Sequence, residues 1–158
     1  MLSWLFYGVM CKKQDVNEKT TVPGVRLAVI RDMRQVKKYD AHLSVERLSA
    51  CINDDLVYVL CKGDDILGIL RYSLFWQTIP FLDLLFLDES VRGRGYGTQL
   101  MAFWENEMRQ RGYTYVMTST QADETAWRFY EKSGYRKIGS FLPPGQDADE
   151  WMYLKELS

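Results

Sequence analysis

The sequence predicts one domain of mixed α and β (α+β) class, in which a mixed sheet is flanked by helices. Strand-like and helix-like segments follow each other in the order β, α, α, β, β, β, α, β, α, β, β. Two of the strand-like segments are joined by Gly63-Asp64-Asp65, a composition typical of a hairpin turn. The chain has 158 residues, of which 47% are hydrophobic, so it can bury a sizeable core as one domain.

The first half of the chain supplies the hairpin and its flanking elements. Residues 25–32 (VRLAVIRD) are strand-like. Residues 33–54 are predicted to be helical, because three apolar residues recur at helical spacing: Val45, Leu48 and Ile52. The hairpin strands are 56–62 and 66–76. Residues 81–87 (FLDLLFL) are almost continuously apolar, which favours a strand covered on both faces.

The next helix is predicted over 97–111, with one apolar stripe made by Leu100, Met101, Trp104 and Met108. Gly112 is expected to end it, because glycine readily takes the left-handed conformation that follows a helix. The segment 113–120 (YTYVMTST) is a further strand.

The C-terminal part is predicted to hold a short helix and two closing strands. Asp123 is expected to cap the helix, which runs to Ser133 and is ended by Gly134. The closing strands are YRKIGSFL and EWMYLKEL, on either side of the turn Pro143-Pro144-Gly145.

Residues 1–24 are predicted to be an extension outside the core domain, which occupies residues 25–158. The segment MLSWLFYGVM is apolar over ten residues, too short to cross a bilayer as a helix. Its lysines follow the apolar run rather than precede it, unlike a signal peptide. A cytoplasmic location without a membrane partner is therefore expected, with the chain a monomer or homodimer.

The charge and the metal-ligating residues exclude several classes of function. Twenty basic and 21 acidic residues give a net charge of −1, so nucleic acid is not expected as a partner. No CxxC pair occurs among the three cysteines, which are interpreted as core residues of a reducing compartment. His42 is the only histidine, so neither a metal site nor a Ser-His-Asp triad is expected.

Arginine and glycine are concentrated in RGRGYG, residues 92–97, between the apolar strand and the helix that follows. Glycines let a ligand approach the main chain, and the first turn of a helix offers unpaired N–H groups and partial positive charge. Arg92 and Arg94 add full charges, so the loop could bind a diphosphate. A glycine-rich turn with solvated arginines is an equally open interpretation. Neither a P-loop nor a GxGxxG motif is present.

Two motifs resemble those of the GNAT superfamily of N-acetyltransferases. RGRGYG matches the pattern Q/R-x-x-G-x-G/A, and DETAWRFYEKSGY (123–135) resembles N-x-x-A-x-x-[FL]-Y-E-K-x-G-[FY]. Both occur in the family's order, and the resemblance covers roughly residues 25–157. It implies a GNAT-like, mostly antiparallel sheet that is splayed between strands 4 and 5, where acetyl-CoA inserts as the acyl donor.

The resemblance also assigns donor-binding roles. Leu85 and Leu87, with Phe86 between them, take the positions whose main chain binds the pantetheine arm. Seven positions that follow would lie along the pyrophosphate and the rest of the donor: Arg92, Gly93, Arg94, Gly95, Tyr96, Gly97 and Thr98. Asp123 stands where the family usually has asparagine. An ionised carboxylate cannot donate a hydrogen bond, so that contact with the donor is in doubt.

Tyr130 occupies the position of the family's general acid, and its phenol can protonate a leaving thiolate. It also shares a helical face with Phe129 and could simply be a core residue. Asp83 interrupts an apolar strand, on the same face as Phe81 and Leu85, and is the candidate general base. It could instead be the partner of a nearby arginine or tyrosine. Glu89 is a weaker candidate for the base.

The acceptor is expected to be a primary amine of a small molecule or a protein. Acidic residues of the late loop could attract such a cation, although a solvated loop is the simpler interpretation: Asp147, Asp149 and Glu150. Two functions remain open, an acetyl-CoA-dependent N-acetyltransferase and a non-catalytic module that binds acyl-CoA as a sensor or scaffold.

Overall fold

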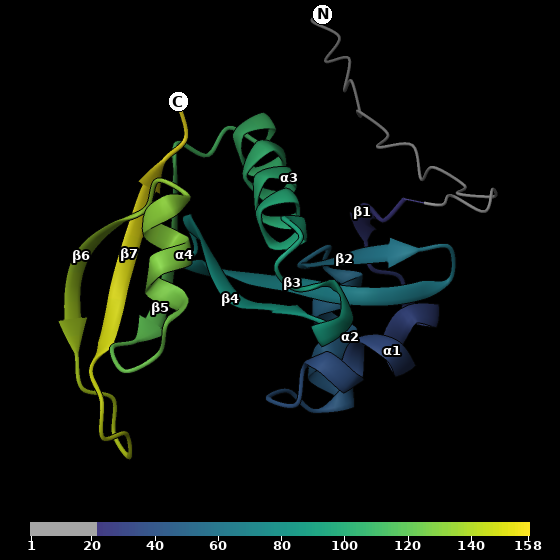
Figure 1. Cartoon of the computed structure of the whole chain (residues 1–158), viewed down its shortest axis with the longest axis horizontal. Helices are drawn as coiled ribbons and strands as arrows, with labels where there is room; N and C mark the ends of the chain where they lie inside the picture. The colour runs from purple at the N-terminus through teal and green to yellow at the C-terminus, as the bar shows by residue number, and fades with distance from the viewer. Residues whose placement is uncertain (1–21) are drawn as a thin grey trace, which may run out of the picture.

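The computed structural model describes residues 22–158, in which one seven-stranded sheet carries helices on both faces (Figure 1). The predicted order of strands and helices is confirmed, with two added 3₁₀ turns. The elements are β1 (Gly24–Leu27), η1 (Ile30–Asp32), α1 (Met33–Tyr39), α2 (Val45–Asn53), β2 (Val57–Lys62), β3 (Asp65–Phe75), β4 (Ile79–Leu87), η2 (Glu89–Val91), α3 (Tyr96–Gln110), β5 (Tyr115–Gln121), α4 (Ala126–Lys132), β6 (Arg136–Phe141) and β7 (Glu150–Glu156).

The strands follow the spatial order β1-β2-β3-β4-β5-β7-β6. All neighbouring pairs are antiparallel except β4 and β5, which run parallel. The predicted mixed, mostly antiparallel sheet is therefore confirmed. A parallel pair needs a crossover connection, and α3 supplies it between β4 and β5.

One face of the sheet packs against α3 and α4, which Figure 1 shows above β2–β4 and in front of β5 and β7. The predicted stripe of α3 is confirmed, because each of its side chains is at most 1% exposed: Leu100, Met101, Trp104 and Met108. It packs in one cluster with residues of five strands and with Tyr130 of α4. This cluster attaches α3 and α4 to β2, β3, β4, β5 and β7.

The other face packs against α1 and α2, through a second cluster that includes Leu48, Ile52 and Ile69. The cluster extends as far as Leu84 of β4, and among the described residues none of its members lies in β5, β6 or β7. The helices on this face therefore cover only the first half of the sheet.

Two local predictions are corrected. β1 ends at Leu27 instead of continuing to residue 32, because the Asp32 carboxylate accepts hydrogen bonds from Arg26 (2.6 Å) and from the Val29 amide (2.9 Å) and so stabilises a 3₁₀ turn. Asp123 does not cap α4. The N-cap position belongs to Thr125, two residues later, so the exposed Asp123 lies in the preceding loop.

The glycines predicted to end helices have that role. Gly112 after α3 and Gly134 after α4 both have φ of +88°. The predicted extension lies mostly outside the described part of the chain, which begins at Val22. Within that part, no helix is long and apolar enough to cross a membrane. Residues 22–158 also contain no cluster of three or more potential metal ligands.

Candidate active site

The central feature of the site is the point at which β4 and β5 separate. The two strands are paired only at Phe81 with Met117 and at Leu82 with Thr118. The Thr118 hydroxyl closes this short pairing by donating a hydrogen bond to the Leu82 carbonyl (3.1 Å). Beyond Leu82 the strands diverge, as the predicted splay requires. We call this point, between Leu82 and Thr118, the apex.

A β-bulge sits at the apex. Arg71 of β3 pairs with Leu84, whereas the next residue, Tyr72, pairs with Leu82, so Asp83 is the extra residue of β4. The bulge shifts the alternation of the strand. Leu82 and Leu85 therefore pack on the α3 face, while Leu84 packs against α1 and α2. The expectation that Asp83 shares a face with Leu85 was wrong for this reason.

After the apex, the main chain of β4 has groups that do not pair with β3. The Asp88 amide donates to the Leu67 carbonyl (2.8 Å), which makes Gly68 and Leu87 a non-hydrogen-bonded pair of the antiparallel ladder. In such a pair the N–H and C=O groups point away from the neighbouring strand. The same alternation applies to Leu85, so Leu85 and Leu87 direct their main-chain groups toward the gap left by β5.

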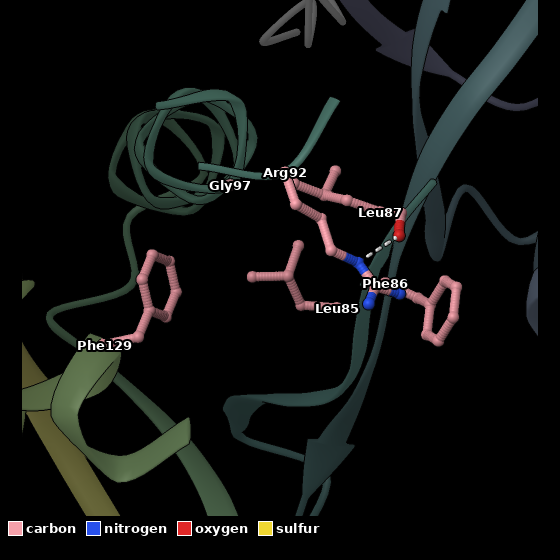
Figure 2. A pocket seen from close by; sticks show the side chains of 6 residues that line it. All are labelled: Leu85, Phe86, Leu87, Arg92, Gly97 and Phe129. Atoms are coloured by element: carbon pink, nitrogen blue, oxygen red, sulfur yellow. Dashed lines mark hydrogen bonds between the residues drawn. The ribbon is translucent and has the colours of Figure 1, made fainter. Parts of the chain in front are cut away.

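This gap is an open cavity of about 250 Å³ between β4, α3 and α4. It is lined by Leu85, Phe86, Leu87, Arg92, Gly97 and Phe129. Figure 2 shows Leu85 and Phe129 facing each other across it, with Gly97 at the start of the helix above. The Phe86 ring points away from Phe129 and packs near Tyr39 of α1 (centroids 5.8 Å apart), so this ring does not face the predicted donor path.

The glycine-rich loop leads from this cavity into α3. Gly93 and Gly95 have φ of +71° and +84°, which side-chain-bearing residues rarely adopt. Gly95 is the N-cap residue, and the first helical bond runs from the Gln99 amide to its carbonyl (3.0 Å). The amides of Tyr96, Gly97 and Thr98 therefore have no partner within the helix, and a helix N-terminus of this kind suits an anion.

The two arginines of the loop differ in their contacts. Arg92 donates from Nε to the Leu87 carbonyl (2.9 Å), its guanidinium carbon lies 5.0 Å from the centroid of the Phe86 ring, and Nη1 is 3.9 Å from Glu89. Figure 2 shows the bond to Leu87. Arg92 thus occupies a carbonyl that was predicted to meet the donor. Arg94 is exposed.

The Tyr130 side chain extends from α4 into the cluster on the α3 face of the sheet, which also includes Leu82 at the apex. The Tyr130 side chain is 8% exposed and its ring packs against those of Tyr135 and Tyr153. Burial raises the pKa of the Tyr130 phenol, and an interaction with the Thr118 hydroxyl opposes this shift. Thr118 also bonds the Leu82 carbonyl, so the phenol lies near the apex. A buried phenol of this kind stays protonated at neutral pH and is able to donate a proton.

Asp83 faces the other side of the sheet. Its carboxylate accepts hydrogen bonds from Arg71 Nη1 (3.0 Å) and Ser73 Oγ (3.0 Å), and its side chain is 23% exposed. Burial raises the pKa of this carboxyl above its ordinary value, and the nearby Asp40 raises it further, while Arg71 and Ser73 oppose the rise. The sequence left open whether Asp83 is a base or an arginine partner. It has such a partner, and a raised pKa also suits a base.

Sequence reasoning missed Arg71, which joins three elements. Its Nε binds Asp40 at the end of α1 (2.6 Å) while Nη1 binds Asp83. Asp40 is fully buried and also accepts from the His42 amide (3.2 Å). A signal was present, because Arg71 interrupts the apolar run ILGILRYS as Asp83 interrupts FLDLLFL. The network ties the loop between α1 and α2 to the apex.

The remaining candidates lie outside the apex. Asp123 is exposed in the loop before α4. The Glu89 side chain is 91% exposed, as expected for a solvated residue at the loop entrance. In the late loop the Asp149 carbonyl accepts from the Ala122 amide (2.8 Å), which attaches that loop to the end of β5.

Comparisons with known proteins identify related sequences and related folds. The sequence model of the acetyltransferase (GNAT) family matches residues 27–135. An acetyltransferase of Agrobacterium fabrum (strain C58 / ATCC 33970) is 40% identical over 63 residues, which are 40% of this chain and 45% of that protein. The match thus spans less than half of the relative's length.

Solved structures share the fold at low sequence identity. Ard1 from Thermoplasma volcanium superposes with a TM-score of 0.76 at 18% identity, over 86% of this chain and 98% of that one. The PaiA N-acetyltransferase from Thermoplasma acidophilum, solved with coenzyme A, gives a TM-score of 0.70 at 15% identity, over 85% and 99% of the two chains. Identities in this range establish a shared fold.

Proposed function

The chain belongs to the acetyltransferase (GNAT) family, and from that membership we propose that it transfers an acetyl group from acetyl-CoA to a primary amine. One observation supports this proposal above the others. Tyr130 and Asp83 flank the apex from opposite faces of the sheet, beside a cavity into which β4 directs main-chain groups that do not pair with β3. A thioester at the apex would lie between a proton donor and a proton acceptor.

The donor would bind along β4 and the start of α3. The main chain of Leu85 and the amide of Leu87 would pair with the amide groups of the pantetheine arm as an additional strand does, whereas the Leu87 carbonyl accepts from Arg92. The amides of Tyr96, Gly97 and Thr98 would receive the pyrophosphate, with charge from Arg92 and Arg94. The donor fits the site, because Gly97 leaves space between Leu87 and Phe129 that a side chain would fill.

The proposed reaction is direct attack of the amine on the thioester carbonyl. The amine must lose a proton, which Asp83 would accept directly or through a water molecule. The C–N bond then forms, the C–S bond breaks, and the thiolate of coenzyme A leaves. Tyr130 would give this sulfur its proton, because the raised pKa of this buried phenol keeps it protonated until the thiolate leaves.

Asp83 can act in this way only if its ion pair with Arg71 is compatible with proton transfer. Burial raises the pKa of Asp83, which makes it a stronger base than an exposed carboxylate. Arg71 keeps it ionised and fixes its orientation. One carboxylate oxygen accepts a bond from Arg71 and the other accepts a bond from Ser73. Each oxygen therefore keeps a lone pair that can accept the proton.

A second function, binding of acyl-CoA without turnover, is favoured by Asp123. The family usually has an asparagine here, whose amide can donate a hydrogen bond, whereas an ionised carboxylate cannot. Both functions would take place in the cytoplasm, a location supported by the free thiols of Cys51 and Cys61. The two functions are distinguished by incubating the intact protein with acetyl-CoA and a panel of primary amines.

Release of coenzyme A thiol, dependent on the amine and matched by an acetylated product in the mass spectrum, is expected for the enzyme. An increase in melting temperature with acetyl-CoA, without thiol release for any amine, would support the binding module instead. If neither thiol release nor an increase in melting temperature is observed, both functions are rejected.

A further inference from the structure

Aromatic side chains gather at the β3–β4 hairpin, close to the apex. The rings of Phe75 and Phe81 lie 6.0 Å apart in a stacked arrangement, and Trp76 lies 4.7 Å from Phe75. Trp76 is 79% exposed, more than any other large hydrophobic residue of the described chain. We call these three residues the aromatic patch.

The turn that presents the patch is conformationally unusual. Trp76 and Gln77 have φ of +53° and +62°, values that normally require glycine, asparagine or aspartate at both central positions of a hairpin turn. A bulky residue with positive φ is an outlier, and such residues are concentrated at functional sites. The turn holds the tryptophan on the surface, although a smaller residue would suit the backbone better.

The patch is continuous with the proposed acceptor side of the apex. Ser73 pairs with Phe81 across the hairpin and donates to Asp83, so all three lie on one face of the sheet. Phe81 precedes Asp83 by two residues, a distance of about 6 Å along the strand. Among the described residues, neither Phe75 nor Phe81 belongs to the cluster that α1 and α2 cover, which extends only as far as Leu84 of β4.

The donor cavity lies on the opposite, α3 face, so an acceptor would approach the apex from the side of Asp83. We propose that this acceptor is a primary amine joined by a short alkyl spacer to an aromatic ring, and that the aromatic patch binds the ring. The inference rests on the proposed acetyl transfer. The ammonium group would be attracted by Asp83, and the ring would pack on Phe81 and Phe75, with Trp76 covering its outer edge.

The test compares 2-phenylethylamine with propylamine as acceptors for the full chain and acetyl-CoA. The wild-type kcat/KM, corrected for the fraction of free base, should favour 2-phenylethylamine at least about tenfold, the low end for burial of a ring. Trp76→Gly removes the indole and suits the positive φ, so folding should be preserved. Trp76→Gly and Phe75→Leu should reduce kcat/KM for 2-phenylethylamine severalfold and leave that for propylamine unchanged.

Phe103→Leu is the matched control, because Phe103 is a partly exposed aromatic of α3, outside the patch, and it should change neither rate. An aryl preference unaffected by both patch variants, or no aryl preference at all, would overturn the inference while acetyl transfer stands. A dimer that becomes a monomer in Trp76→Gly, with equal losses for both amines, would make the patch an interface and also overturn it. No thiol release with any amine would reject the proposed function itself.

Discussion

Replacement of Gly97 by alanine should separate donor binding from folding. Gly97 is in the first turn of α3, and its φ lies outside the left-handed range. An added Cβ would be 3.5 Å from a Leu87 methyl and 3.7 Å from the Phe129 ring, both ordinary van der Waals distances. The substitution therefore fits the structure described here, yet it occupies space that lines the donor cavity.

Both effects of Gly97→Ala can be given a magnitude. Alanine in place of glycine stabilises a helix by about 0.5–1 kcal/mol, which corresponds to a melting temperature about 1–4 °C higher in a domain of this size. A methyl group forced into a filled site costs about 1–3 kcal/mol. If acetyl-CoA fills the cavity, its Kd should therefore rise roughly 5- to 150-fold.

Calorimetric titration with acetyl-CoA and thermal unfolding of the free protein measure the two effects. Gly139→Ala in β6 is the control, because no atom lies within 4 Å of its added Cβ, and the Kd should stay the same. An unchanged Kd in a Gly97→Ala protein of normal stability would refute the assignment of this cavity to the donor. A lower melting temperature would refute the packing argument.

The other predictions concern charge. Arg92→Ala should raise the Kd for acetyl-CoA more at low salt than at high salt, and an effect independent of salt in a titration series would argue against a phosphate contact. Asp83→Asn should lower kcat/KM at neutral pH with partial recovery at high pH. A uniform loss at every pH would show that Asp83 does not act as a base. Folding raises the pKa of Asp83 above 3.8, so ionisation of this carboxyl destabilises the folded state. In urea titrations, the wild type should therefore lose stability relative to Asp83→Asn as the pH rises above that value. Arg71→Lys weakens the double ion pair, so the acid limb of the kcat/KM profile should move to higher pH. A lower melting temperature with an unmoved limb would make Arg71 purely structural.

The parts of the site that depend on local sequence could be predicted. The glycines before α3 are needed for positive φ at Gly93 and Gly95, and the stripe of α3 follows from helical periodicity. Both signals come from residues that are close together in the sequence. Local sequence chemistry failed at the start of α4, where the N-cap is Thr125, two residues after the predicted Asp123.

The parts that depend on pairing between distant segments could not be predicted. The bulge at Asp83 is a property of the register between β3 and β4, and it separates Asp83 from the face of Leu85. Arg71 meets Asp40, which is 31 residues away in sequence, only because α1 packs across β3. Nothing in the composition of the hairpin indicates that Trp76 would remain exposed beside the apex.

The central claim, that Tyr130 protonates the leaving thiolate, is tested most directly by kcat of Tyr130→Phe with two donors. The ring stays in place, so stability and donor affinity should change little. With acetyl-CoA and a confirmed amine, kcat should fall by roughly 10²–10⁴, the usual contribution of one general acid. With an activated thioester, whose leaving group has a low pKa and needs little protonation, the loss should be much smaller. Equal losses with both donors would indicate positioning rather than acid catalysis, and no loss with either would contradict the claim.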